Sequence, residues 1–377
     1  MPHRAALNLL EEQLHYPLGD RLPAGGQTLA VVPGVGTGLA PAVKWIRMGL
    51  PFALDHINLW LLRDEIAAED GSGMVRQGWT VVDCCITHDA AKSQWEQIFA
   101  SELEGLPVLR VIVTHMHPDH IGLAHWLCAR WSTPDQPCRL WISATDYNAA
   151  RIGSQTTTGF GGASAADFFA AHGLTDPEAV DKIRGRSSYY PSMVPDVPRS
   201  FRRLQDGQLL RIGGREWRCI SGFGHAPEHM ALYCDALGTL ISGDMMLPRI
   251  STNVSVYDVE PESDPLQAFL DSIDKFSALP RHTLVLPSHG KPFTGLHERI
   301  GQLHAHHRDR LAEVMAACSV EPQSAADILP VLFRRKLDLH QTTFAMGEAV
   351  AHLHLLWFQG RLVRRRDADR IWRFSAA

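Results

Sequence analysis

The stretch THMHPDH at residues 114–120 decides how the rest of this sequence is interpreted. It follows the continuous apolar run LRVIVTH, which is typical of a buried strand, and precedes IGLAHWLCARW, which has helical spacing. Its side chains therefore leave one edge of a predicted sheet within a few positions. Four of them are imidazoles or carboxylates, the groups that hold zinc or iron in proteins: His115, His117, Asp119 and His120.

Three polar residues farther along the chain also end apolar runs. They are His225 in GFGHAPEH, Asp244 in LISGD and His289 in LVLPSHG. Each of these alone is explained equally well by an ordinary structural role. Together with residues 114–120 they supply five histidines and two aspartates, which is enough for two metal ions that share one carboxylate. The sequence therefore predicts a dinuclear metal site.

The composition predicts one large folded domain and a small one. The 377 residues are 45% hydrophobic and 20% charged, which is ordinary for a protein with a sizeable core. Residues 301–377 contain 11 Lys and Arg against 8 Asp and Glu, whereas the first 300 residues contain 25 against 33. An acidic body with a mildly basic tail argues against a general nucleic-acid binder.

The cysteines and the N-terminus point to a cytoplasmic protein. The seven cysteines form no CxxC pair, and their number is odd. The N-terminal segment has acidic residues inside its apolar stretch and no cleavage-site pattern, so we expect no signal peptide. No uncharged apolar run is long enough for a membrane span, and we expect no membrane contact.

Strand and helix patterns alternate along most of the chain, which predicts an α/β core. We expect an N-terminal extension at 1–27, a catalytic domain at 28–300 and a C-terminal domain at 301–377. The Gly/Ser/Thr-rich and aromatic segment 146–200 interrupts the catalytic domain, either as a lid-like insertion or as a peripheral decoration. The C-terminal domain has two helical patterns and then two strand patterns around Asp-Ala-Asp, which suggests a small winged-helix-like fold.

The motif H-x-H-x-D-H at 115–120, followed by His, Asp and His in that order, resembles the signature of the metallo-beta-lactamase-fold hydrolase superfamily. The resemblance covers roughly residues 28–296. It implies an αββα sandwich, in which two mixed sheets pack face to face with helices outside and the metals lie at one edge. It also implies two divalent metal ions, zinc first, with iron or manganese as alternatives.

The resemblance also assigns the metal ligands position by position. Those it implies for the first metal are His115, His117 and His225. Those for the second metal are Asp119, His120 and His289, with Asp244 as the bridge.

Two departures from family patterns refine the resemblance. Asp83 in VVDCC matches the acidic residue that family members place behind the site to support the ligand loop, but Cys84 and Cys85 replace the usual small residues after it. Zinc-type beta-lactamases generally have a cysteine ligand where Asp244 stands. The chain therefore resembles the hydrolytic relatives more than the antibiotic-resistance enzymes.

The expected chemistry is hydrolysis. Two dications about 3.5–4 Å apart bind a hydroxide between them and lower the pKa of that water toward about 7. Asp119 is placed to orient this hydroxide and to move a proton, which makes it the candidate catalytic residue. His229 is either a hydrogen-bonding partner of the ligand loop or a surface residue. Tyr189 and Tyr190 either line the substrate pocket or anchor the insertion.

Outside this set, His304, His306 and His307 fall in the helical pattern AHHRDR, and we expect them on a solvated or interface face.

Three functions compete for such a site. The leading one is hydrolysis of a thioester or other small acyl ester, as in glyoxalase II. The second is cleavage of single-stranded RNA, in which the arginines of 364–373 would contact the phosphates. The third is a non-hydrolytic di-iron redox or binding protein, which ranks last because no flavodoxin-like segment is visible. The C-terminal domain is expected to pack on the main domain or on a second subunit of a homodimer.

Overall fold

The computed structural model describes residues 12–34, 41–67, 73–156 and 161–377. Its first large sheet has seven strands in sequence order, of which the first four are antiparallel neighbours and the last three add in parallel. The strands are β1 (Leu29–Val32), β2 (Val43–Gly49), β3 (His56–Ala67), β4 (Val75–Val82), β5 (Val108–Ile112), β6 (Arg139–Ser143) and β7 (Phe201–Leu204).

A second sheet has five strands in the order β12-β11-β10-β9-β8. Only the pair β11 and β12 is parallel. The strands are β8 (Leu209–Ile212), β9 (Arg215–Gly222), β10 (His229–Cys234), β11 (Thr239–Gly243) and β12 (Leu284–Pro287). A separate antiparallel hairpin near the C-terminus consists of β13 (Leu362–Arg366) and β14 (Trp372–Ala376).

The α-helices lie in the longer connections, between β4 and β7 and after β11. In the first half of the chain they are α2 (Asp89–Ser101), α3 (Pro118–Ile121), α4 (Ala124–Trp131), α5 (Ala144–Gly153), α6 (Gly162–Ala171), α7 (Pro177–Arg184) and α8 (Tyr189–Met193). In the second half they are α9 (Pro265–Asp274), α10 (Leu296–Val320), α11 (Ala325–Leu332) and α12 (Leu339–Phe358), with short 3-10 turns η1 (Asp235–Leu237) and η2 (Lys275–Ala278).

The two large sheets pack face to face because their strands alternate apolar side chains between two buried sides. In β2, Val43 and Trp45 point into the space between the sheets, whereas Ile46 and Met48 pack on the outer face. Apolar side chains of β8–β11 close the same inner core from the second sheet. The two outer faces would be exposed without further layers.

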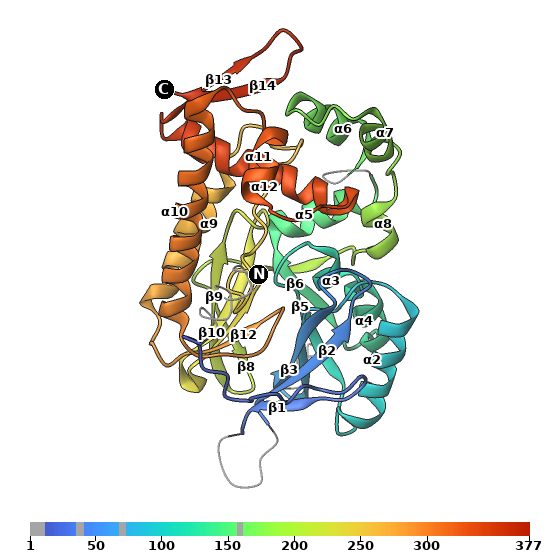
Figure 1. The fold of residues 1–377 in the computed structure, drawn as a ribbon. Helices are drawn as coiled ribbons and strands as arrows, with labels where there is room; N and C mark the ends of the chain where they lie inside the picture. The colour runs from blue at the N-terminus through green and yellow to red at the C-terminus, as the bar shows by residue number, and fades with distance from the viewer. Residues whose placement is uncertain (1–11, 35–40, 68–72, 157–160) are drawn as a thin grey trace.

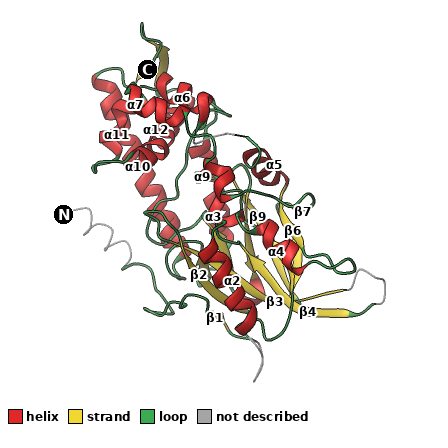
Figure 2. Ribbon diagram, turned by 90° about the vertical axis from the view of Figure 1, so that its right-hand side faces the viewer, coloured by secondary structure: helices red, strands yellow, loops and turns green. Residues whose placement is uncertain are grey.

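Helices cover both outer faces, as Figures 1 and 2 show. Side chains of α2, α4 and α5 share one apolar cluster with the outer face of the first sheet. Side chains of α9, α10 and α12 share another with the outer face of the second sheet. The resulting order of helix, sheet, sheet and helix confirms the αββα sandwich with a small C-terminal domain.

The segment 146–200 joins the sandwich to the C-terminal helices. Helices α5 and α8 pack in the outer core of the first sheet, whereas α6 and α7 share the apolar cluster of α11 and α12. The backbone N–H of Ala326 in α11 donates to the carbonyl of His172, 3.2 Å away. Figure 1 shows these helices over the end of the sandwich where β5 leads into α3.

The structure can be compared with the domain boundaries that the sequence predicted near residues 27 and 300. Residues 1–11 of the expected N-terminal extension lie outside the described residues, and His15 pairs with Thr294 in an isolated bridge. Helix α10 runs continuously through the boundary expected at 300/301. After it, α11, α12 and the hairpin follow in the order that the sequence predicted. None of the helices in the described part of the chain is long and apolar enough to cross a membrane.

Of the two expectations for the histidines of α10, a solvated or an interface face, the solvated one is wrong for His307. His307 is 1% exposed, and its ring lies 5.6 Å from that of His352 in α12. The reason is helical register, since the buried residues of α10 recur three and four positions apart and position 307 falls in that series. The polar residues around His307 concealed this periodicity in the sequence.

A buried ion pair connects the two sheets at the end away from residues 114–120. Asp64 of β3 is 1% exposed and accepts two hydrogen bonds from the Arg110 guanidinium, at 2.9 and 2.7 Å. The same carboxylate accepts from the Thr80 hydroxyl at 2.6 Å and from the N–H of Gly213 in the second sheet at 2.9 Å. These three partners come from β4, β5 and the turn before β9, so one carboxylate joins several elements.

We predict that Asp64→Ala lowers the free energy of unfolding by about 3–5 kcal/mol, because Arg110 is then buried without its partner. Urea unfolding measures the loss. Glu216→Ala, which removes an exposed carboxylate from β9, is the control and is expected to cost under about 0.5 kcal/mol. Equal stability of the two variants would contradict the prediction.

Candidate metal centre

The loop between β5 and α3 carries the first ligand candidates. His115 follows the strand, His117 is the N-cap of α3, and Asp119 and His120 lie within that helix. Pro118 occupies the first helical position, where the missing N–H costs no hydrogen bond. The local sequence thus changes from strand to helix within the motif, so the four side chains are carried by two different backbone geometries.

Three imidazole nitrogens meet on one side of this loop. His115 Nε2 lies 2.9 Å from His117 Nδ1 and 3.2 Å from His225 Nε2. The third side of the triangle, from His117 Nδ1 to His225 Nε2, is 3.1 Å. His225 comes from the connection between β9 and β10 in the second sheet, so the cluster spans both sheets.

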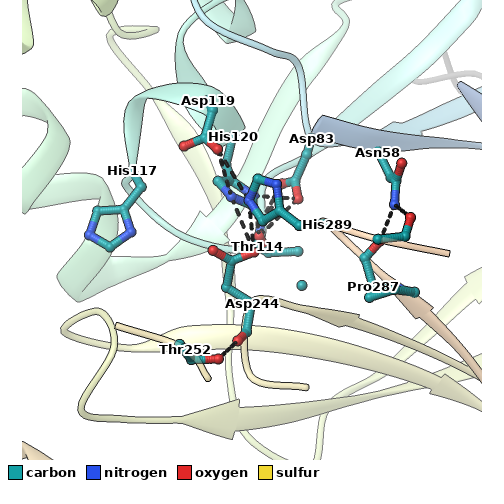
Figure 3. Close-up of polar contacts among 12 residues, drawn as sticks. Asn58, Asp83, Thr114, His117, Asp119, His120, Asp244, Thr252, Pro287 and His289 are labelled. Atoms are coloured by element: carbon teal, nitrogen blue, oxygen red, sulfur yellow. Dashed lines mark hydrogen bonds and ion pairs between the residues drawn. The ribbon is translucent and has the colours of Figure 1, made fainter. Parts of the chain in front are cut away.

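A second cluster lies beside the first. His289, which follows β12, has its Nε2 atom 3.4 Å from Asp119 Oδ2. His120 Nε2 lies 3.6 Å from the same oxygen. Figure 3 shows Asp119, His120 and His289 grouped above Asp244.

Asp244, at the end of β11, faces both clusters with different oxygens. Its Oδ2 atom lies 3.3 Å from His225 Nε2, in the first cluster. Its Oδ1 atom lies 3.5 Å from both His120 Nε2 and His289 Nε2, in the second. Asp244 could thus offer one oxygen to each cluster, as the resemblance implied.

The donor set fits two divalent metal ions. Four ligand atoms at about 2.0–2.1 Å around one tetrahedral ion would lie about 3.3 Å apart, close to the distances in both clusters. His120 Nε2 and Asp244 Oδ1 are buried and have no hydrogen-bond partner among the described residues. Buried polar atoms are normally satisfied, so two ligand-type atoms that face each other without a hydrogen bond fit a site for a divalent cation.

Hydrogen bonds to the Nδ1 atoms orient the imidazole rings of three candidate ligands. Asp83, directly after β4, accepts from His120 Nδ1 at 2.8 Å and from the N–H of Thr114 at 2.8 Å. This leaves His120 Nε2 free for a metal ion. The carbonyl of Asn253 accepts from His225 Nδ1 at 2.7 Å, and the carbonyl of His56 accepts from His289 Nδ1 at 2.7 Å.

His229 and Gly243 together hold the bridging residue. His229 Nε2 accepts from the backbone N–H of Asp244 at 3.2 Å. Gly243 has φ +53, and a Cβ there would lie 2.1 Å from His229 Nε2, so only glycine leaves room for the ring. Of the two readings of His229, the geometry matches a partner of the ligand loops, because the residue is fully buried.

The electrostatics differ between the two clusters. Burial lowers the pKa of His117 to about 3 and that of His115 well below the usual value. Burial alone would also lower the pKa of His289, but the carboxylates of Asp244 and Asp119 raise it to about 10. The pKa of His120 is raised well above the usual value by the same two carboxylates and Asp83, against the effect of burial. In the absence of metal, the imidazoles of His120 and His289 therefore hold protons where a second metal ion would bind.

The two tyrosines proposed for the substrate pocket lie differently. Tyr190 is buried, and its hydroxyl donates to the carbonyl of Met116 in the ligand loop at 2.5 Å, which anchors that loop. Tyr189 is half-buried, and its ring lies 5.6 Å from that of His340 in α12. Burial raises the pKa of Tyr189 to about 12, and the charge of Asp119 adds to this shift, so its phenol lies within electrostatic range of the ligands.

The sequence reasoning missed Asp146, which connects the two ligand loops. Its carboxylate accepts from the N–H of Met116 at 2.7 Å and from the N–H of Glu228 at 2.5 Å. Burial raises its pKa to about 6. Asp146 lies in the first turn of α5, three positions after the last residue of β6, so the rule that singled out Asp244 and His289 does not reach it.

Comparisons with known proteins agree with this fold and site. The family model of the metallo-beta-lactamase superfamily matches residues 74–289, more than half of the chain, and the model described as metallo-beta-lactamase-like, C-terminal domain, matches residues 311–377. A beta-lactamase domain protein from Burkholderia ambifaria is similar in structure, with a TM-score of 0.88 and 53% identity, over 98% of this chain and 100% of that chain.

Two further relatives extend over most of the chain. The "Probable metallo-hydrolase YqjP" of Bacillus subtilis (strain 168) is 24% identical over 332 residues, which cover 82% of this chain and 91% of the relative. A metallo-beta-lactamase family protein from Thermus thermophilus has a TM-score of 0.68 and 26% identity, over 90% of this chain and 99% of that chain.

The fold and the clustered histidines and aspartates are those of a metal-dependent hydrolase. The chain belongs to the metallo-beta-lactamase superfamily.

We predict that Asp83→Ala weakens binding of the second metal ion by about 10- to 100-fold, because His120 loses the acceptor that orients its ring. Competition with a chromophoric chelator measures the affinities of both ions. Asp89→Ala, an aspartate on the exposed part of α2, is the control. Unchanged affinity for the second ion in Asp83→Ala would show that His120 is oriented by other contacts.

We also predict that the second metal ion competes with protons more strongly than the first near neutral pH. His289, with its pKa of about 10, and His120 must each lose a proton, so affinity for that ion is expected to rise as pH increases from about 6 to 9. His115 and His117 are already neutral there. Calorimetry in buffers of different ionisation enthalpy counts the released protons. Equal proton release by both ions would contradict the assignment.

Proposed function

We propose that this protein hydrolyses a thioester or another small acyl ester with two metal ions bound at the clusters described above. The proposal depends mainly on one observation, the two oxygens of Asp244 that each face a separate set of ligand atoms. The metal ions, with zinc as the first candidate, would supply an activated water molecule and polarise the scissile carbonyl when bound.

The residues of the chain have distinct parts in this chemistry. His115, His117 and His225 would hold the first ion, and His120 and His289 would hold the second together with Asp119. The Asp119 side chain is 18% exposed, against 10% for Asp244, so it is the ligand carboxylate turned more toward solvent. The neighbouring imidazoles of His120 and His289 lower its pKa to about 2, although burial opposes this, and keep it ionised. An ionised, accessible carboxylate is suited to orienting water and accepting its proton.

The rim of the site supports a small substrate with an apolar part. His340, at the start of α12, stacks on Phe52 with ring centroids 6.1 Å apart and contacts Tyr189. Three separate segments thus bring rings together, and the phenol of Tyr189 lies within electrostatic range of Asp119. An aromatic rim suits the acyl part of a small ester better than a long polyanion.

RNA cleavage is the second candidate, with weaker support. The arginines of the C-terminal hairpin are partly neutralised, since Arg364 pairs with Glu262 at 2.7 Å and Arg373 pairs with both Asp327 and Asp367. Figure 1 shows this hairpin at the far end of the C-terminal domain from α3. A phosphate track from the hairpin to the metals would have to cross α11 and α12.

The test is turnover of a panel of thioesters, lactones, phosphodiesters and short RNAs by the metal-loaded protein. We expect hydrolysis of an acyl substrate, with kcat lowered more than about 100-fold in His117→Ala and Asp244→Ala, because each loses metal-based stabilisation worth several kcal/mol. His304→Ala, which removes an imidazole that pairs with Asp274 in α9, is the matched control.

A folded His117→Ala protein with full metal content and full rate would overturn the ligand assignment. RNA cleavage that weakens steeply with salt, without turnover of any acyl substrate, would reverse the order of the two functions.

A further inference from the structure

Helix α12 of the C-terminal domain lies directly against the segment that follows the bridging aspartate. The N–H of Val256 donates to the carbonyl of Gly347 in α12 at 3.1 Å. A Cβ on Gly347 would lie 2.7 Å from the Cβ of Ser255, so the absence of a side chain allows this close approach. The Ser255 hydroxyl also reaches the carbonyl of Phe344, one turn earlier in the helix, at 3.4 Å.

The next residue of α12, Glu348, faces the same segment with its side chain. Its Oε2 atom accepts from the Asn253 side-chain amide at 3.2 Å. The amide oxygen of Asn253 is used as well, because it accepts from the Ser255 hydroxyl at 2.8 Å. The Asn253 side chain is therefore held from both ends, by the helix on one side and by its own segment on the other.

The backbone of Asn253 supports a metal ligand. Its carbonyl accepts from His225 Nδ1 at 2.7 Å, which leaves His225 Nε2 turned toward His115, His117 and Asp244. The preceding residue, Thr252, donates its hydroxyl to the carbonyl of Asp244, a contact drawn in Figure 3. The segment 252–255 thus lies between α12 and two ligands of the first metal ion.

We propose that Glu348 is a positioning residue of the metal centre, acting through Asn253 to fix the carbonyl that orients His225. The C-terminal domain then completes the site for the first metal ion. This inference depends on the metal centre proposed above. The expected effect is on the first ion, because the Asn253 carbonyl contacts its ligand His225. The described partners of His120 and His289 come from Asp83, Thr114 and His56 rather than from α12.

The ionisation of Glu348 is consistent with this position. Burial raises its pKa to about 7, although the hydrogen bond from Asn253 opposes the shift. The phenol of Tyr257, on the same segment, lies within electrostatic range of the carboxylate. The Asn253 amide is a hydrogen-bond donor to this buried carboxyl group, and the hydrogen bond restricts the rotation of the Asn253 side chain.

The test measures binding of Co²⁺ and Zn²⁺ to the full chain by chelator competition, with the Co²⁺ absorption spectrum as a second readout. Glu348→Ala is expected to lower the affinity for the first ion about 10- to 100-fold and to change the absorption spectrum of Co²⁺ bound there. The affinity for the second ion is expected to stay the same. Glu348→Gln is expected to restore both readouts, because its amide oxygen still accepts from Asn253. Glu260→Ala and Glu260→Gln, the same changes at an exposed position of the 252–264 segment, are the controls.

A double-mutant cycle with Asn253→Ala tests the route. Asn253→Ala keeps the carbonyl that accepts the hydrogen bond from His225 Nδ1 but removes the contact with Glu348. The double variant should bind the first ion no more weakly than either single variant, because each substitution breaks the same hydrogen bond between Asn253 and Glu348.

Additive losses, equal weakening of both ions, or failure of Glu348→Gln to restore binding would overturn the inference. The proposed function is tested separately, since it fails if the unaltered protein binds no second ion or hydrolyses no ester.

Discussion

The structure depends on one electrostatic constraint, the burial of two carboxylates and five imidazoles at the junction of two sheets. Carboxylates so close together repel each other and are costly to bury without positive charge. Protons on His120 and His289 supply part of that charge, as the raised pKa of His289 shows. Two divalent cations would supply all of it, and the remaining polar atoms around them are arranged to favour that state.

Much of this could be predicted from sequence because it is encoded locally. The series from His115 to His120 lies on one loop, and Asp244 and His289 each end an apolar strand, so strand periodicity and residue type were sufficient. The strand and helix patterns predicted an α/β core, and the sandwich followed from the resemblance to a known family. Helix boundaries and the register of α10 were less predictable, since the polar letters around His307 concealed its apolar face.

The parts that escaped prediction are long-range. Asp146 meets Glu228 across 82 positions, and Asn253 meets Glu348 across 95. No short pattern marks such pairs, because each depends on how separate elements pack. The same applies to the packing of α6 and α7 against the C-terminal helices, which gives the insertion and the C-terminal domain one shared apolar cluster. Most ligands are therefore recognisable from short sequence patterns, whereas the residues that orient them come from distant parts of the chain.

The ion pair of Asp64 and Arg110 has a consequence for how this molecule can change. Asp64 lies six residues along β3 from Asn58, whose amide donates to the carbonyls of Pro287 and Gly290 beside His289. At about 3.3 Å per residue, the two positions are roughly 20 Å apart on one rigid strand. Each end of β3 therefore has its own polar contact with the second sheet, and only the contact at Asn58 lies beside the metal ligands. Loops around the ligands can diverge and acquire new selectivity without loosening the contact at Asp64.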